Sequence, residues 1–169
     1  MKVRLLCRLG LLSVIALTIF MLEAQLPPIV PIPGVKLGLA NIVTVFAAFT
    51  LGPWPAVAVL SVRIFLGAVF SGQMSTLLYS AVGGVLAIVV TILLSKALTQ
   101  RQIWVAGCLG AVAHNLGQLL VAVAVTQTPQ LVRYLLPVLL LSGIIAGLFT
   151  GLSAQMLINH LQKVGRNEK

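Results

Sequence analysis

The chain contains no aspartate, and Glu23 and Glu168 are its only acidic residues. Transferases that depend on Mg²⁺ usually hold the metal with paired carboxylates. A chain with one internal carboxylate cannot build such a site alone, so we expect a protein that is not an enzyme and uses no cofactor. Lysine never follows glycine in this sequence, which therefore also lacks the G-x-x-x-x-G-K-[ST] loop with which many ATPases hold phosphates.

Metal ligands and nucleic-acid contacts are equally scarce. The two cysteines, Cys7 and Cys108, stand inside apolar runs without metal-ligand spacing, as is typical of buried small residues. His160 lies far along the chain from His114, so no metal site is predicted. The net charge is +9, but the basic residues stand at the ends of apolar runs, where they would meet lipid headgroups. We therefore expect a lipid bilayer, and no nucleic acid, as the partner of this charge.

Charged residues make up 8% of the chain and hydrophobic residues 60%, whereas soluble proteins are about a quarter charged. We expect an all-α polytopic membrane protein that forms a single integral domain over residues 1–169. Residues 5–24 also resemble a signal peptide, but Leu22 and Glu23 do not suit cleavage after Ala24, so a retained helix is favoured. The predicted transmembrane helices are six, at about 5–24, 35–51, 54–70, 76–98, 103–126 and 131–160.

Proline and glycine mark the breaks between these spans. Residues 25–34 hold four prolines, which exclude a helix and predict an extended or re-entrant connection. Gly52 and Pro53 separate spans two and three, which should form a tight hairpin, and Pro55 suits the first turn of span three. Pro137 either kinks span six or marks the start of its regular part.

Basic residues are distributed unevenly between the two sides of this arrangement. One side holds eight (Lys2, Arg4, Arg8, Lys96, Arg101, Lys163, Arg166 and Lys169), and the other holds Lys36 and Arg133. Cytoplasmic loops carry an excess of Lys and Arg, so both termini should be cytoplasmic. An even number of spans agrees with this, and we expect a bacterial cytoplasmic (inner) membrane protein.

Arg63 is the one basic residue that lies deep inside a span rather than near its ends. It follows Trp54 by nine residues, about 13 Å of helix, which places it near the bilayer centre. A charge at this depth costs ~2.5–3.5 kcal/mol on insertion scales and needs a partner or an aqueous cavity. Either Glu23 forms an ion pair with Arg63, or Arg63 binds an anionic substrate; both hold if Glu23 releases Arg63 when substrate arrives.

Three more polar residues occur near the middle of span five. Gln118 shares a helix face with His114 and with Asn115, at spacings of four and three residues. This stripe predicts either the wall of a cavity, in which His114 and Asn115 donate hydrogen bonds to a substrate, or hydrogen bonds between helices.

The start of span two carries Lys36 and Asn41. A helix N-terminus attracts anions, and Lys36 would strengthen that attraction, or it would extend toward the headgroups. Glu23, Lys36 and Gln73 should lie on the outer side, with Arg63 and His114 deeper, so the polar path indicates capture from outside. The candidate substrate-binding residues are Glu23, Lys36, Asn41, Arg63, Gln73, Tyr79, His114, Asn115 and Gln118.

Glycines predict close helix packing. Gly143, Gly147 and Gly151 repeat every four residues in span six, a doubled G-x-x-x-G, and should pack against another helix of this chain or of a second subunit. Gly83 and Gly84 in span four allow close approach or a local bend.

Four stretches of sequence resemble a known family: PGVKLGLANIVT (33–44), SVRIFLGAVFSG (61–72), LLYSAVGG (77–84) and GAVAHNLGQLLVA (110–122). They are similar to the Gx transporter family, which is also named heptaprenyl diphosphate synthase component I. The family is related to S components of energy-coupling-factor transporters. That resemblance implies a six-helix S-component-like bundle that binds a vitamin-like small molecule from outside.

The resemblance also implies partners, and two readings of the function follow. An uptake component would act with a separate transmembrane coupling subunit and two ATPases, which fits the missing phosphate loop. S components often carry two alanines four residues apart in their first helix for this docking, whereas Ala16 here is followed by Phe20. The alternative is a non-catalytic membrane subunit of a prenyl synthase in isoprenoid or quinone synthesis, because the chain has no D-D-x-x-D motif.

Overall fold

The computed structural model describes residues 3–26, 36–72 and 74–167, and all regular structure in these ranges is helical. The expected all-α membrane fold is confirmed: five helices are long and apolar enough to cross a membrane, and a sixth apolar helix is shorter. The helices are α1 (Val3–Glu23), α2 (Asn41–Thr50), α3 (Pro53–Ser71), α4 (Met74–Ala97), the 3₁₀ turn η1 (Gln100–Gln102), α5 (Ile103–Thr126) and α6 (Leu131–Asn167).

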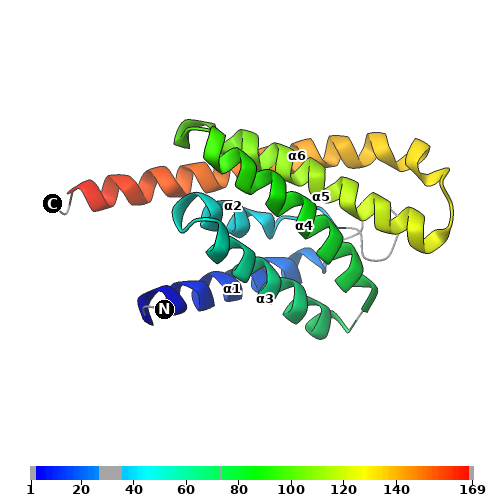
Figure 1. Cartoon of the computed structure of the whole chain (residues 1–169), viewed down its shortest axis with the longest axis horizontal. Helices are drawn as coiled ribbons and strands as arrows, with labels where there is room; N and C mark the ends of the chain where they lie inside the picture. The colour runs from blue at the N-terminus through cyan, green and yellow to red at the C-terminus, as the bar shows by residue number, and fades with distance from the viewer. Residues whose placement is uncertain (1–2, 27–35, 73, 168–169) are drawn as a thin grey trace.

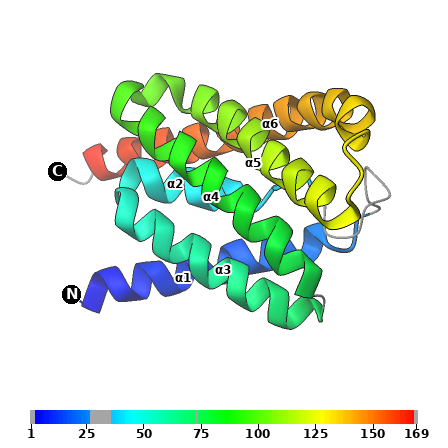
Figure 2. The same cartoon turned by 45° about the vertical axis from the view of Figure 1, so that its right-hand side comes forward.

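The helices form a bundle whose two described ends of chain lie at the same end (Figure 1). In Figure 2, α5 and α6 lie along one side of the bundle and α1 and α3 along the other, with α2 and α4 between them. Contacts between helices follow this order, because α5 packs against α4 and α6, while α3 packs against α1 and α4. The path therefore brings α2, which carries the candidate residue Asn41, next to α5 and α6, which come much later in the chain.

The second helix differs from the expected span. We predicted a helix from residue 35, but residues 36–40 are not helical and α2 begins at Asn41. Gly38 has a φ of +81°, a left-handed conformation that interrupts a right-handed helix. The ten residues of α2 cover about 15 Å, half of a hydrocarbon core. Despite its length, α2 contacts all five of the longer helices and so lies at the centre of the bundle.

Glycines allow the close approach of α4, α5 and α6. A Cβ atom on Gly117 would lie 2.7 Å from the Cα atom of Gly83, so these two glycines place α5 directly against α4. Gly107 of α5 faces Gly151 of α6 in the same way, and a Cβ on Gly147 would lie 2.6 Å from the Cα of Cys108. The G-x-x-x-G repeat of α6 therefore packs against α5 of the same chain.

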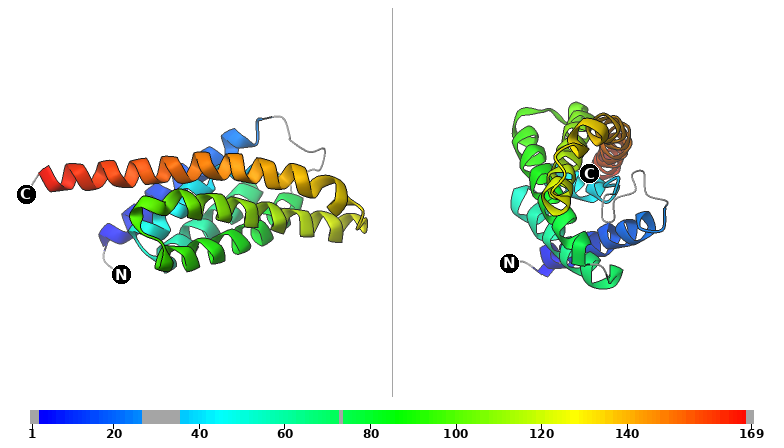
Figure 3. Two further views of the ribbon diagram at one scale, coloured as in Figure 1. Left: turned by 90° about the horizontal axis from the view of Figure 1, so that it is seen from above. Right: turned by 90° about the vertical axis from the view of Figure 1, so that its right-hand side faces the viewer.

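The last helix is longer than the bilayer requires. Its 37 residues span about 55 Å, compared with about 30 Å of hydrocarbon. Pro137 lies within α6, which begins at Leu131, so the prediction that Pro137 marks the start of the regular helix was wrong. The C-terminal part extends past the other helices (Figure 3), and the helix continues beyond the expected end at residue 160.

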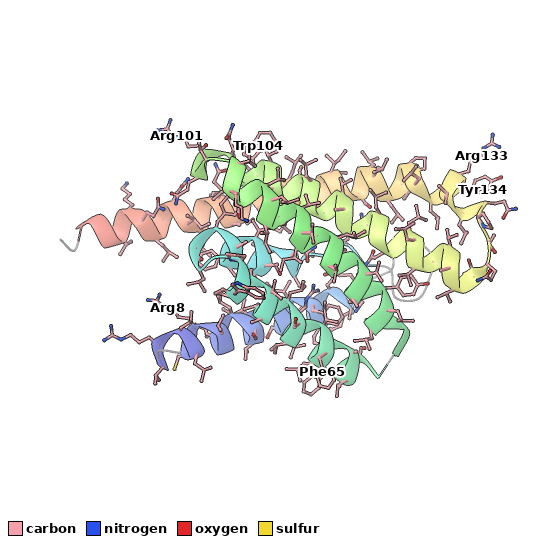
Figure 4. The ribbon with its side chains drawn as sticks, in the orientation of Figure 1. Arg8, Phe65, Arg101, Trp104, Arg133 and Tyr134 are labelled. Atoms are coloured by element: carbon pink, nitrogen blue, oxygen red, sulfur yellow. The ribbon has the colours of Figure 1, made fainter. Side chains whose placement is uncertain are left out.

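The outer surface agrees with a membrane protein. Large apolar side chains such as Phe65, which is 64% exposed, cover the sides of the bundle. Figure 4 shows Arg8 and Arg101 near the end that holds both termini, and Arg133 with Tyr134 at the opposite end. The chain is thus a multi-pass membrane protein with basic residues at both ends of its apolar surface.

Candidate ligand-binding site

The site is organised around the carboxylate of Glu23, the last residue of α1. Its Oε1 atom accepts the backbone N–H of Gly38 at 2.6 Å, and its Oε2 atom accepts the N–H of Leu39 at 2.9 Å. Only 5% of Glu23 is exposed. Because both oxygens are used, this buried anion holds the segment 36–40 against the end of α1.

The contact of Glu23 with Gly38 and Leu39 bears on whether an outside anion can bind at the start of α2. The sequence predicted that an anion would bind there, and Glu23 supplies one from within the chain. The first N–H groups of α2 itself are also occupied, since Asn41 donates to the carbonyl of Gly38 and Ile42 to that of Leu39. An outside anion must therefore bind to side chains of the site rather than to these backbone groups.

Two cations share the ring of Phe20, which lies one turn before Glu23 on α1. The Nζ atom of Lys36 lies 3.7 Å from the ring centroid, and the guanidinium carbon of Arg63 lies 5.7 Å from it. Gly67, one turn after Arg63 on α3, makes room for this ring, because a Cβ at that position would lie 2.7 Å from Phe20 Cε1. The Phe20 ring therefore lies within cation–π distance of both Lys36, from the 36–40 segment, and Arg63, from α3.

A chain of hydrogen bonds connects the same segment to α5. The backbone N–H of Lys36 donates to Gln118 Oε1 at 3.3 Å, which leaves the amide nitrogen of Gln118 to donate to His114 Nε2 at 3.1 Å. A ring nitrogen that accepts carries no proton, so this arrangement assigns the proton of neutral His114 to Nδ1. Nδ1 lies beside Gly83 of α4, where it has no hydrogen-bond partner of good geometry.

Asn41 and Thr44 line the centre of the bundle without using their polar atoms. Both are buried on one face of α2, and within the described part of the chain neither amide atom of Asn41 nor the hydroxyl of Thr44 has a hydrogen-bond partner. Gly38 lies between Asn41 and His114, since a Cβ there would be 3.0 Å from Asn41 Nδ2 and 3.1 Å from His114 Cδ2. Asn41 therefore adds a free donor and a free acceptor beside His114.

Arg63 is the most unusual residue of the site. It is 2% exposed, and neither Nε nor Nη2 of its guanidinium has a hydrogen-bond partner among the residues that the structure describes. No ion pair within 4.0 Å forms among the described residues, so of the two alternatives for Arg63 the direct ion pair with Glu23 is not the one found. The physical reason is that the backbone of Gly38 and Leu39 competes successfully for the Glu23 carboxylate.

The other candidate residues lie away from this cluster. The Nδ2 atom of Asn115 donates to the carbonyl of Leu139 on α6 at 2.7 Å, so Asn115 joins α5 to α6. Tyr79 is buried in an apolar cluster with Leu119 and Leu139. Gln73 lies outside the described residues. The structure therefore brings together Glu23, Lys36, Asn41, Arg63, His114 and Gln118, whereas Asn115 and Tyr79 face other neighbours.

Sequence reasoning missed Phe20, Gly38 and Thr44. Phe20 precedes Glu23 by three residues and Thr44 follows Asn41 by three, so both share a helix face with a predicted residue. That spacing was the available signal. Thr76 of α4 also has a buried, unpartnered hydroxyl, although it had no motif to mark it. Across the described residues, no group of three His, Cys, Asp or Glu side chains comes together as a metal site would require.

Comparisons with known proteins give one match. The family model for heptaprenyl diphosphate synthase component I matches residues 12–157, which includes every residue of the site. No curated protein and no solved structure matches the chain. Because the match covers most of its length, the chain belongs to the heptaprenyl diphosphate synthase component I family.

Proposed function

We propose that this member of the heptaprenyl diphosphate synthase component I family is a membrane-embedded protein that binds and takes up a small anionic molecule. The main support for this proposal is the buried guanidinium of Arg63. A buried guanidinium without hydrogen-bond partners is costly in a protein interior, and more so in a bilayer, unless an anion joins it. The chain's acids do not supply that anion, because Glu23 is bound to backbone and Glu168 is the only other one.

Other unpaired polar groups in the interior of the bundle support a binding site rather than an isolated defect at Arg63. Asn41 and Thr44 add further buried polar atoms without partners, and each such atom costs about 1–3 kcal/mol if it stays unpaired. Several unpaired groups in one region are compensated together if a polar ligand enters. Asn41 and Arg63 each stand eleven residues from Gly52, at the turn of the hairpin, which places them at similar depth.

The position of the site supports uptake. The segment 36–40 leads into the end of α2 that points away from both termini (Figure 1). With cytoplasmic termini, as the bias of basic residues predicts, this end faces outward. The chain has no phosphate-binding loop of the ATPase type, so energy for uptake would come from a separate transmembrane subunit and ATPases, as in the S components that the sequence resembles.

The test is whether a bound anion depends on Arg63. The protein would be purified in mild detergent and its co-purified small molecules measured by native mass spectrometry. We expect Arg63→Gln to retain at least about tenfold less of the bound compound. Arg133→Gln is the matched control, because it removes the same charge from an exposed position.

Correct folding of Arg63→Gln is checked by gel filtration and thermal unfolding. A folded variant that retains as much ligand as the wild type would refute the proposal. Uptake is then measured in cells that carry either variant, with the identified compound as the labelled substrate.

The family name supports a second function, that of a non-catalytic membrane subunit of a prenyl synthase. The specific observation in its favour is the C-terminal part of α6, which extends past the bundle and offers exposed side chains such as Leu161 and Lys163 to a soluble protein. Pull-down from detergent separates the two functions. Recovery of a prenyl synthase without a transport subunit or ATPase would favour the second.

A further inference from the structure

The unpaired nitrogens of the Arg63 guanidinium form one edge of that group. In a guanidinium, Nε and Nη2 lie on one edge, and their N–H bonds point in nearly the same direction. These are the two nitrogens of Arg63 that are buried and have no hydrogen-bond partner in the described ranges. Such an edge presents two parallel donors, which match the two oxygens of a carboxylate in a side-on, bidentate pair.

The charges of the site limit how much negative charge a ligand can bring. Arg63 and Lys36 each bring one positive charge to the Phe20 ring, and Glu23 carries one negative charge near them. His114 is a neutral acceptor toward Gln118, so the site has a net charge of one positive unit. A ligand with one negative charge neutralises the site, whereas each further charge would be buried without compensation.

We propose that the ligand is a small monocarboxylate whose two oxygens bind the Nε/Nη2 edge of Arg63. The inference rests on the proposed function, since it names the class of molecule that the same site binds. Lys36 contributes attraction at the rim, because it is partly exposed while Arg63 is enclosed. Asn41 offers a donor and an acceptor to a second polar group of the ligand.

A prenyl diphosphate fits this site poorly. Its headgroup carries up to three negative charges, which proteins usually neutralise with several basic residues or with Mg²⁺ held by carboxylates. Here the carboxylate of Glu23 is already bound to Gly38 and Leu39, and the described residues near it supply two cations. The site thus selects against the substrate class that the family name indicates.

The experiment compares ligands that share one tail and differ in charge. Hexanol, hexanoate and hexyl phosphate are added to the purified protein in detergent, with geranyl diphosphate as the diphosphate probe, and thermal unfolding is recorded. We expect hexanoate at saturation to raise the unfolding temperature by about 2 °C or more, and the other probes to raise it less. Arg63→Gln should abolish the hexanoate effect, while Arg133→Gln should leave it intact.

Arg63→Lys tests the shape of the contact separately from its charge. Lysine keeps the positive charge but lacks the paired edge, so hexanoate should bind this variant at least about tenfold more weakly than the wild type. Equal binding would overturn the bidentate contact. A larger, Arg63-dependent shift with hexyl phosphate or geranyl diphosphate would overturn the monocarboxylate and leave the proposed function standing. If no probe and no co-purified compound binds in an Arg63-dependent way, both fail.

Discussion

The carboxylate of Glu23 lies 2.6 Å from the backbone nitrogen of Gly38, and this contact determines where α2 begins. It joins the end of α1 to a segment fifteen residues later, and it occupies the acid that the sequence offered as one of two possible partners for Arg63. The ion pair is replaced by hydrogen bonds from Gly38 and Leu39 to a charged acceptor, which are stronger than those to a neutral one.

Glu23→Gln should therefore lower the free energy of unfolding more than Glu168→Gln does. A glutamine side chain has one acceptor oxygen, so one of the two N–H groups would face a donor. We expect a loss of about 1.5–3 kcal/mol in the free energy of unfolding. Thermal unfolding in detergent measures it, and Glu168→Gln, which removes the only other acid, is the control. Equal stability of both variants would contradict the role of Glu23.

Arg63→Met should stabilise the ligand-free protein while it abolishes ligand binding. Replacing a buried, unpaired charge by an apolar side chain of similar length removes a desolvation penalty, and gains of about 1–4 kcal/mol are known for buried ionic groups. Unfolding of ligand-free samples would be compared with retention of the ligand. Strong destabilisation by Arg63→Met would instead mean that Arg63 supports the fold.

Asn41 and Asn115 should differ in what their removal changes. Asn115→Ala deletes the hydrogen bond to Leu139 across α5 and α6, so we expect a loss of about 0.6–2 kcal/mol in stability with ligand binding retained. Asn41→Ala deletes no side-chain hydrogen bond to any described residue, so stability should change little while ligand affinity falls. The pair is measured by the same unfolding and binding assays, and the opposite pattern would place the site beside Asn115.

Gly147→Ala should disturb the packing of α5 and α6. Its Cβ would lie 2.6 Å from the Cα of Cys108 and 2.8 Å from the carbonyl oxygen of Gly107. Both are backbone atoms of α5, so neither can move aside on its own. Overpacking of this kind costs about 1–3 kcal/mol. Gly10→Ala is the matched control, because a Cβ there meets nothing within 4 Å and alanine favours the helix. If both substitutions have the same effect on unfolding, close packing at Gly147 is not needed.

The orientation of the bundle can be tested with single cysteines. In a background of Cys7→Ser and Cys108→Ala, the variants Ala97→Cys and Gln130→Cys place a thiol at exposed positions of opposite ends. A membrane-impermeant maleimide should label Gln130→Cys in intact cells, and Ala97→Cys only after the cells are opened. The reverse result would put both termini outside.

The helices of this fold are encoded locally, and most of them could be predicted. The range 103–126 was expected as a span and is α5, because its apolar run ends at clear polar breaks. The start of α2 could not be found in this way. It depends on Glu23, a residue of another helix, and on the left-handed conformation of Gly38. At the far end, α6 continues past residue 160 because its polar residues still favour a helix outside the bilayer.

The sequence predicted which residues form the site better than it predicted which contacts they make. His114 and Asn115 are neighbours in sequence, but a helix turns about 100° per residue, so they point to different partners. His114 meets Gln118, while Asn115 meets α6. Phe20 carried no signal of its own, because one aromatic residue in an apolar span looks like any core residue. Its role depends on the cations that other segments bring to its ring.

The central position of α2 has a consequence for how the protein meets different membranes. Thr50 is the only fully exposed residue of α2, and lipid reaches this helix mainly through the apolar groove between α1 and α6 that Ile42 and Phe46 line. Changes in bilayer thickness act first on the tilt of the surrounding helices. They would reach Asn41 only through side chains of the protein itself. We therefore expect ligand affinity to vary little among nanodiscs whose lipids differ in acyl-chain length, even where the unfolding temperature of the protein changes.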